Sequence, residues 1–135
     1  MPKFSKKSLE HLNTCDERLQ RVFNEVIKHF DCTILEGHRS DERQEELYRQ
    51  GLSKLKQGSK HNSSPSKAID VVPYIKGKGI PWNDSKYFYH FSGYVLGVAN
   101  SMGIKLRSGY NWDMDDDLDD QTFFDGPHYE LVEDE

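Results

Sequence analysis

The stretch SKHNSSPSKAIDVVPY, residues 59–74, joins a polar loop to a short apolar strand. The strand AIDVV, residues 68–72, ends before Pro73, because proline cannot donate a ladder hydrogen bond. Asp70 interrupts this apolar run, and burying a carboxylate is costly unless a cation or several hydrogen bonds compensate it. Two interpretations follow: Asp70 faces solvent by simple alternation along the strand, or it belongs to a polar site.

The residues on either side of this stretch predict two long helices and a small sheet. Apolar residues recur at intervals of three and four over about 16–30 and 85–102, which is typical of amphipathic helices. Thr14 and Glu17 match a capping box at the start of the first helix. Shorter helices are expected over 5–12 and from Ser40 to Gly51. Strands are expected over 33–35, 68–72, 104–107 and 129–132. Together they predict an α+β fold, a small antiparallel sheet packed against two longer amphipathic helices in a single domain.

Composition and charge exclude some classes of protein. The chain has 135 residues with 12% aromatic residues, enough for one compact core. No apolar run approaches the roughly 20 residues of a membrane-spanning helix, and the basic N-terminus lacks the apolar stretch of a secretory signal. Basic residues are dispersed over 1–110, whereas 111–135 hold 11 acidic and no basic residues. The acidic end would repel phosphates, so a nucleic-acid partner is not expected.

His61, Asp70 and His128 fit a catalytic metal site. Zinc in such sites takes three nitrogen or oxygen ligands from the protein and leaves one position for water, whose pKa falls to about 7. Asp125 precedes His128 by three residues in DGPHYELV, residues 125–132, and could act as general base. Arg39 could bind a substrate carboxylate or stabilise a developing oxyanion. Taken singly, Asp-Gly-Pro is also an ordinary turn signal, and Arg39 is also compatible with a surface salt bridge.

Six segments in this order resemble one family of peptidases. They are GHRS at 37–40, SKH at 59–61, AIDVVPY at 68–74, IPWND at 80–84, GIKLRSGYNWD at 103–113 and DGPHYELV at 125–132. The set is similar to the zinc peptidases that include D-alanyl-D-alanine carboxypeptidases and dipeptidases, and most of all to the L-alanyl-D-glutamate endopeptidases used as phage endolysins.

The resemblance implies a role for each matching residue. His61, Asp70 and His128 would bind a single zinc ion, Asp125 would be the general base, Arg39 would assist the substrate or the transition state, and Ser59 would contact the substrate. The family usually places the first histidine and the aspartate seven residues apart, whereas here they are nine apart. We expect residues 63–65 to form a bulge that leaves both ligands in place.

The acidic segment NWDMDDDLDDQ, residues 111–121, suggests a second metal. Asn111, Asp113, Asp115 and Asp117 alternate, and alternate oxygen ligands in a loop can bind Ca²⁺. The segment lacks the glycine and the final glutamate of an EF-hand loop. Its resemblance to some phage endopeptidases implies calcium regulation. The other interpretation is a solvated acidic loop.

The expected function is zinc-dependent hydrolysis of the L-alanyl-D-glutamate bond in peptidoglycan stem peptides, as in host lysis by a phage endolysin. Residues 1–135 would form one catalytic domain, including the acidic loop and without a separate cell-wall-binding domain. We expect a monomer without stable membrane association, made in the host cytoplasm and reaching the wall after another protein permeabilises the membrane. The alternatives are a D-alanyl-D-alanine carboxypeptidase or dipeptidase, and a non-catalytic, metal-stabilised binding domain.

Overall fold

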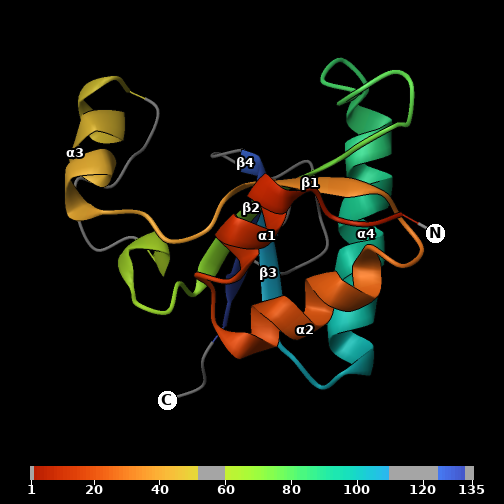
Figure 1. The fold of residues 1–135 in the computed structure, drawn as a ribbon, viewed down its shortest axis with the longest axis horizontal. Coiled ribbons are helices and arrows are strands. Elements are labelled where there is room, and N and C mark those ends of the chain that lie inside the picture. The colour runs from red at the N-terminus through yellow and green to blue at the C-terminus, as the bar shows by residue number, and fades with distance from the viewer. Residues whose placement is uncertain (1, 52–59, 110–124, 133–135) are drawn as a thin grey trace.

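The computed structural model describes residues 2–51, 60–109 and 125–132, and it has the expected α+β architecture (Figure 1). The helices are α1 (Lys6–Leu12), α2 (Glu17–Val26), α3 (Asp41–Arg49) and α4 (Ser85–Ser101), with a 3₁₀ turn η1 (Lys60–Asn62). The strands are β1 (Cys32–Glu36), β2 (Ala68–Pro73), β3 (Leu106–Gly109) and β4 (Asp125–Leu131). Within the described residues, no helix combines the length and the apolar composition needed to cross a membrane.

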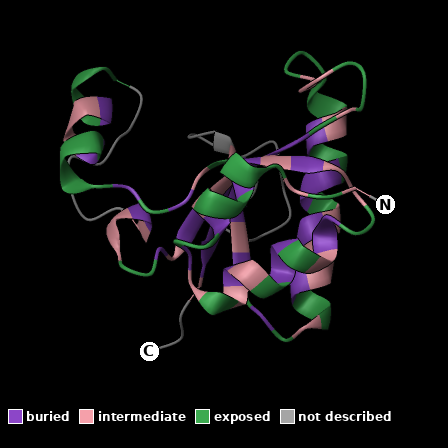
Figure 2. Ribbon diagram, viewed as in Figure 1, coloured by how far each residue is buried: buried purple, intermediate pink, exposed green. Residues whose placement is uncertain are grey.

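The four strands form one antiparallel sheet in the order β1-β2-β4-β3. One face is apolar and packs on α2 and α4, because side chains alternate between the two faces of a strand. Figure 2 shows buried residues along the sheet and on the helix faces turned to it, whereas α3 is mostly exposed. The apolar face carries Ile34, Ile69, Val71, Leu106, Tyr129 and Leu131. The polar residues of β2 and β4 therefore share the opposite face.

The first long helix differs from its prediction at both ends. Asp16 is its N-cap and accepts a 2.9 Å hydrogen bond from the Arg18 amide, so the predicted capping box is wrong. The Thr14 hydroxyl instead donates to the His11 carbonyl at 2.6 Å and accepts from the His38 amide at 2.8 Å. The helix ends at Val26, and Phe30 lies beyond it against Phe91 of α4, with ring centroids 5.0 Å apart.

Strand bounds also differ from the prediction near the C-terminus. β4 begins at Asp125 rather than at residue 129, and β3 covers Leu106–Gly109 rather than 104–107. The pairing register between these two strands shifts between Ser108 and Gly109, so that Ser108 pairs with Tyr129 but Gly109 pairs with Asp125. Such a bulge is invisible to a search for strict alternation, which explains the shortened prediction for β4.

Gly37 connects the N-terminal helices to the rest of the fold. It follows β1, and a Cβ at this position would overlap the His11 carbonyl oxygen and lie 2.5 Å from the Thr14 hydroxyl oxygen. Amino acids other than glycine can adopt the backbone conformation of Gly37, because its φ is not positive. Glycine is therefore needed here for close packing.

We predict that Gly37→Ala lowers the free energy of unfolding by about 1–3 kcal/mol, the usual cost of overpacking a closely packed position. Urea denaturation measures the change. Gly97→Ala is the matched control, because the added methyl on exposed Gly97 of α4 meets nothing within 4 Å. That control should be neutral or stabilising by up to about 1 kcal/mol, since alanine favours helices. Equal stability of Gly37→Ala and the wild type would contradict the packing argument.

Candidate functional site

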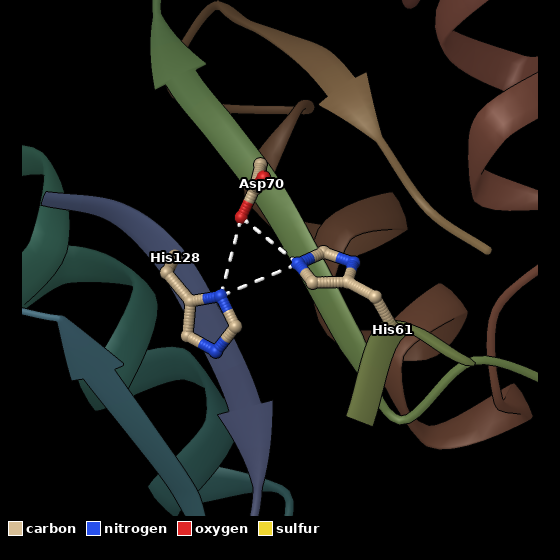
Figure 3. A group of neighbouring side chains, drawn as sticks. All are labelled: His61, Asp70 and His128. Atoms are coloured by element: carbon tan, nitrogen blue, oxygen red, sulfur yellow. Dashed lines mark hydrogen bonds and ion pairs between the residues drawn. The ribbon is translucent and has the colours of Figure 1, made fainter. Parts of the chain in front are cut away.

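Three side chains from distant parts of the chain meet on the polar face of the sheet (Figure 3). His61 comes from η1, Asp70 from β2 and His128 from β4. His61 Nε2 lies 3.2 Å from Asp70 Oδ1 and 3.3 Å from His128 Nδ1, and His128 Nδ1 lies 3.3 Å from Asp70 Oδ1. The two histidines are 1% and 7% exposed, so the group is largely shielded from solvent. The nine-residue spacing between His61 and Asp70 does not separate them.

The backbone places each of the three residues. Asp70 and His128 are direct partners across the β2–β4 ladder, so their side chains share one face. The turn η1 is held by the segment after β1, where the Arg39 amide donates to the His61 carbonyl at 2.7 Å. The side-chain amide of Asn62 donates through Nδ2 to the Arg39 backbone carbonyl oxygen at 2.8 Å. The spacing between His61 and Asp70 is two residues longer than is usual in the family. Within this longer segment, the Ser63 hydroxyl donates a hydrogen bond to the Lys60 carbonyl oxygen at 2.9 Å.

Hydrogen bonds on the far side of each ring assign the two histidine tautomers. His61 Nδ1 lies 2.8 Å from the Gly37 carbonyl oxygen, which can only accept, so the proton is on Nδ1. His128 Nε2 lies 2.8 Å from Glu130 Oε1, so its proton is on Nε2. In these neutral tautomers His61 Nε2, His128 Nδ1 and Asp70 Oδ1 all present lone pairs to one another. Three acceptors this close repel, and a shared cation would relieve that repulsion.

The spacing of the three acceptor atoms fits a tetrahedral metal ion. Ligand atoms about 2.0–2.1 Å from a tetrahedral zinc lie about 3.3 Å from one another. The three separations here are 3.2, 3.3 and 3.3 Å. His61, Asp70 and His128 can therefore hold such an ion without rearrangement, and three protein ligands leave one coordination position for a small molecule.

Asp70 remains charged despite its surroundings. Burial raises the pKa of Asp70, but in the metal-free protein the two imidazoles lower it by more when they carry a proton toward the carboxylate, so the pKa lies below its usual range. The second oxygen, Asp70 Oδ2, lies 3.5 Å from Arg39 Nη2. A carboxylate anion is the form that binds a metal ion.

Arg39 is buried rather than part of a surface salt bridge. Its side chain is 9% exposed, and its guanidinium donates to both oxygens of Glu36, at 2.9 and 3.0 Å. A third hydrogen bond reaches Gln44 Oε1 at 2.7 Å. A bulge in β1 pairs Glu36 directly with Asp70, and two facing carboxylates repel. Arg39 lies against both carboxylates and compensates this repulsion.

Glu36, Gln44 and Glu130 were not predicted from the sequence as part of the site. The one available signal was the spacing of His128 and Glu130, because residues two apart on a strand share a face. Burial raises the pKa of Glu130, but the hydrogen bonds and charges of His128 and Arg107 lower it to about 2. Glu130 is therefore an anion beside His128, on the side of the ring away from Asp70.

Several predicted site residues cannot be placed. Ser59, Asn111, Asp113, Asp115 and Asp117 lie outside the described residues. Asp125 is described through its backbone, at the start of β4. The register shift between Ser108 and Gly109 interrupts the β3–β4 ladder between Asp125 and His128. The alternation of side chains along β4 therefore does not fix whether Asp125 and His128 lie on the same face of the sheet.

Comparisons with known proteins identify the family of this chain. The family model described as phage L-alanyl-D-glutamate peptidase matches residues 1–132. The L-alanyl-D-glutamate peptidase of Escherichia phage T5 is 36% identical over 135 residues, covering 96% of this chain and 98% of that protein. The crystal structure of the Serratia marcescens L-Ala D-Glu endopeptidase ChiX superposes with a TM-score of 0.77 at 27% identity, covering 96% of this chain and 90% of that one. The chain belongs to the phage L-alanyl-D-glutamate peptidase family.

Proposed function

We propose that this protein is a zinc-dependent endopeptidase that hydrolyses the L-alanyl-D-glutamate bond of peptidoglycan stem peptides and serves as a phage endolysin. The observation that supports this most is the convergence of three acceptors, His61 Nε2, Asp70 Oδ1 and His128 Nδ1, within 3.3 Å of one another. Family membership and the names of the two relatives supply the substrate.

Zinc is the proposed ion because of the donor set. Two imidazole nitrogens and one carboxylate oxygen suit zinc, whereas calcium and magnesium prefer sites made of oxygen alone. With one anionic and two neutral ligands, the bound ion would keep a net positive charge. A zinc ion held there would act as a Lewis acid and lower the pKa of water to about 7.

The protein's own residues would handle the protons and the developing charge. We assign to Asp125 the general base that takes the proton of the attacking water and passes it to the amine nitrogen of the leaving D-glutamate residue. Arg39 would stabilise the negative charge that forms on the scissile carbonyl oxygen. Its contacts with Glu36 and Gln44 already occupy N–H groups of the guanidinium, so Arg39 would act here through its positive charge; its alternative role is capture of a substrate carboxylate. Ser59 would contact the substrate.

The biological setting follows from the substrate. The stem peptide lies in the bacterial cell wall, so a lysis enzyme made in the host cytoplasm would need another protein to permeabilise the membrane. Residues 1–135 would act as one catalytic domain and as a monomer.

We predict that the purified protein binds one zinc ion per chain and that His61→Gln, Asp70→Asn and His128→Gln lose it. Each substitution removes one ligand while keeping a side chain of similar size. Metal analysis after dialysis measures the stoichiometry, and circular dichroism checks the fold. His29→Gln is the control, since His29 lies exposed beyond α2. Zinc retained at wild-type stoichiometry and affinity by all three ligand variants would refute the site.

We predict that Asp125→Asn keeps zinc but lowers turnover about 10²–10⁴-fold, the usual contribution of a general acid–base residue. Defined stem peptides with mass spectrometry of the products measure both rate and bond. The expected products end in L-alanine and begin with D-glutamate. Release of D-alanine would favour a D-alanyl-D-alanine carboxypeptidase or dipeptidase. Wall binding without any cleavage by the zinc-loaded wild type would favour a binding domain.

We also propose that Asn111, Asp113, Asp115 and Asp117 bind calcium and that calcium raises activity, because this acidic segment precedes Asp125 and His128 in the chain. Metal-stripped protein should regain less activity with zinc alone than with zinc and calcium together. Asp113→Asn combined with Asp115→Asn should abolish that difference, since carboxylate oxygens are the preferred calcium ligands. Equal activity of the wild type in the two metal conditions would remove the regulatory claim.

A further inference from the structure

We infer that Glu130 is a positioning residue whose carboxylate holds His128 in the tautomer and ring orientation that direct Nδ1 toward Asp70 and His61. The inference rests on the proposed function only through the assignment of His128 as a metal ligand. It concerns a residue that does not face the other two acceptors.

The contact between the two residues is direct. Glu130 Oε1 accepts from His128 Nε2 at 2.8 Å, and the two side chains share the polar face of β4 because they are two residues apart. A neutral imidazole carries one proton, so this hydrogen bond keeps the proton on Nε2 and leaves the Nδ1 lone pair available. Without it, the proton could move to Nδ1 or the ring could turn, and either change would remove an acceptor from the site.

Two cations hold Glu130 in this position. Its other oxygen, Oε2, accepts from Arg107 Nη2 on β3 at 2.6 Å and lies 3.1 Å from Lys60 Nζ. Glu130 is 6% exposed and His128 is 7% exposed, so their contact is buried, whereas the side chains of Arg107 and Lys60 are 32% and 37% exposed. Lys60 directly precedes His61, so the same carboxylate connects the strand of one predicted ligand to the turn of another.

The arrangement differs from a purely structural ion pair. Oε2 contacts both cations, and Oε1 is directed to the imidazole. His61 has an equivalent outer contact, in which the Gly37 carbonyl oxygen lies 2.8 Å from Nδ1. Metal-binding histidines almost always donate their second N–H to a carboxylate or carbonyl group, and loss of that partner typically weakens metal binding about 10–100-fold. The Glu130–His128 pair matches this pattern, and the Glu130 carboxylate is a stronger acceptor than the Gly37 carbonyl group that contacts His61.

The test compares Glu130→Ala and Glu130→Gln with the wild type by two measurements. Competition with a chromophoric chelator gives the zinc affinity, and ¹⁵N NMR of the metal-free protein gives the His128 tautomer. Glu130→Ala should weaken zinc binding about 10–100-fold and shift part of the His128 population to the Nδ1–H tautomer. Glu130→Gln should lose less, because its amide oxygen can still accept from Nε2–H.

Two controls separate positioning from general stability. Val95→Ala removes buried side-chain volume from α4 at the core, away from Glu130, so it should lower the Tm without changing zinc affinity or the tautomer. Arg107→Met removes one partner of Glu130 but leaves its contact with His128, so it should weaken zinc binding less than Glu130→Ala. If Glu130→Ala does not fold, Glu130→Met takes its place, because methionine fills a similar volume without the oxygen that accepts from His128 Nε2–H.

Wild-type zinc affinity and an unchanged His128 tautomer in Glu130→Ala, or in Glu130→Met where Glu130→Ala does not fold, would overturn the inference. Weaker zinc binding in Val95→Ala in proportion to its lost stability would do the same. Failure of the proposed function is distinguishable from failure of this inference. If the wild type binds no zinc or cleaves no stem peptide, ¹⁵N NMR of the metal-free protein still measures the His128 tautomer and its dependence on Glu130.

Discussion

Three hydrogen-bond acceptors that face one another at 3.2–3.3 Å are the constraint on which the rest of this structure depends. His61 Nε2, Asp70 Oδ1 and His128 Nδ1 come from a turn and two strands, and each presents a lone pair to the other two. Their mutual repulsion opposes folding unless a cation is bound or a proton is taken up. The fold therefore holds three mutually repelling acceptor atoms together at the sheet surface. Such an unfavourable arrangement is typical of a functional site rather than of a hydrophobic core.

Layers of outer contacts keep the three acceptors in place. The Gly37 carbonyl oxygen orients His61, and the absence of a side chain at Gly37 lets this segment pack against the turn between α1 and α2. Arg39 lies between the carboxylates of Glu36 and Asp70, and Glu130 contacts His128. Each inner group thus has an outer partner, and changes to these outer residues should alter metal binding.

The sequence singled out the three side chains that the structure brings together, and Arg39 beside them, but little of what surrounds them. Asp70 stood out because a carboxylate interrupts an apolar strand, and the amphipathic patterns predicted the helices and the antiparallel sheet. Glu36 could not be found, because its pairing with Asp70 depends on a bulge in β1 that no alternation pattern reveals. Thr14 was misread as a helix cap because its hydroxyl serves a tertiary contact with His38. Glu130 was overlooked, although its spacing from His128 already placed both on one strand face.

Anomalous diffraction from a zinc-soaked crystal tests the central claim most directly, because it locates the ion relative to individual atoms. The account predicts one zinc peak about 2.0–2.2 Å from His61 Nε2, Asp70 Oδ1 and His128 Nδ1. A zinc peak elsewhere in the molecule, or one bound through Nε2 of His128, would contradict it.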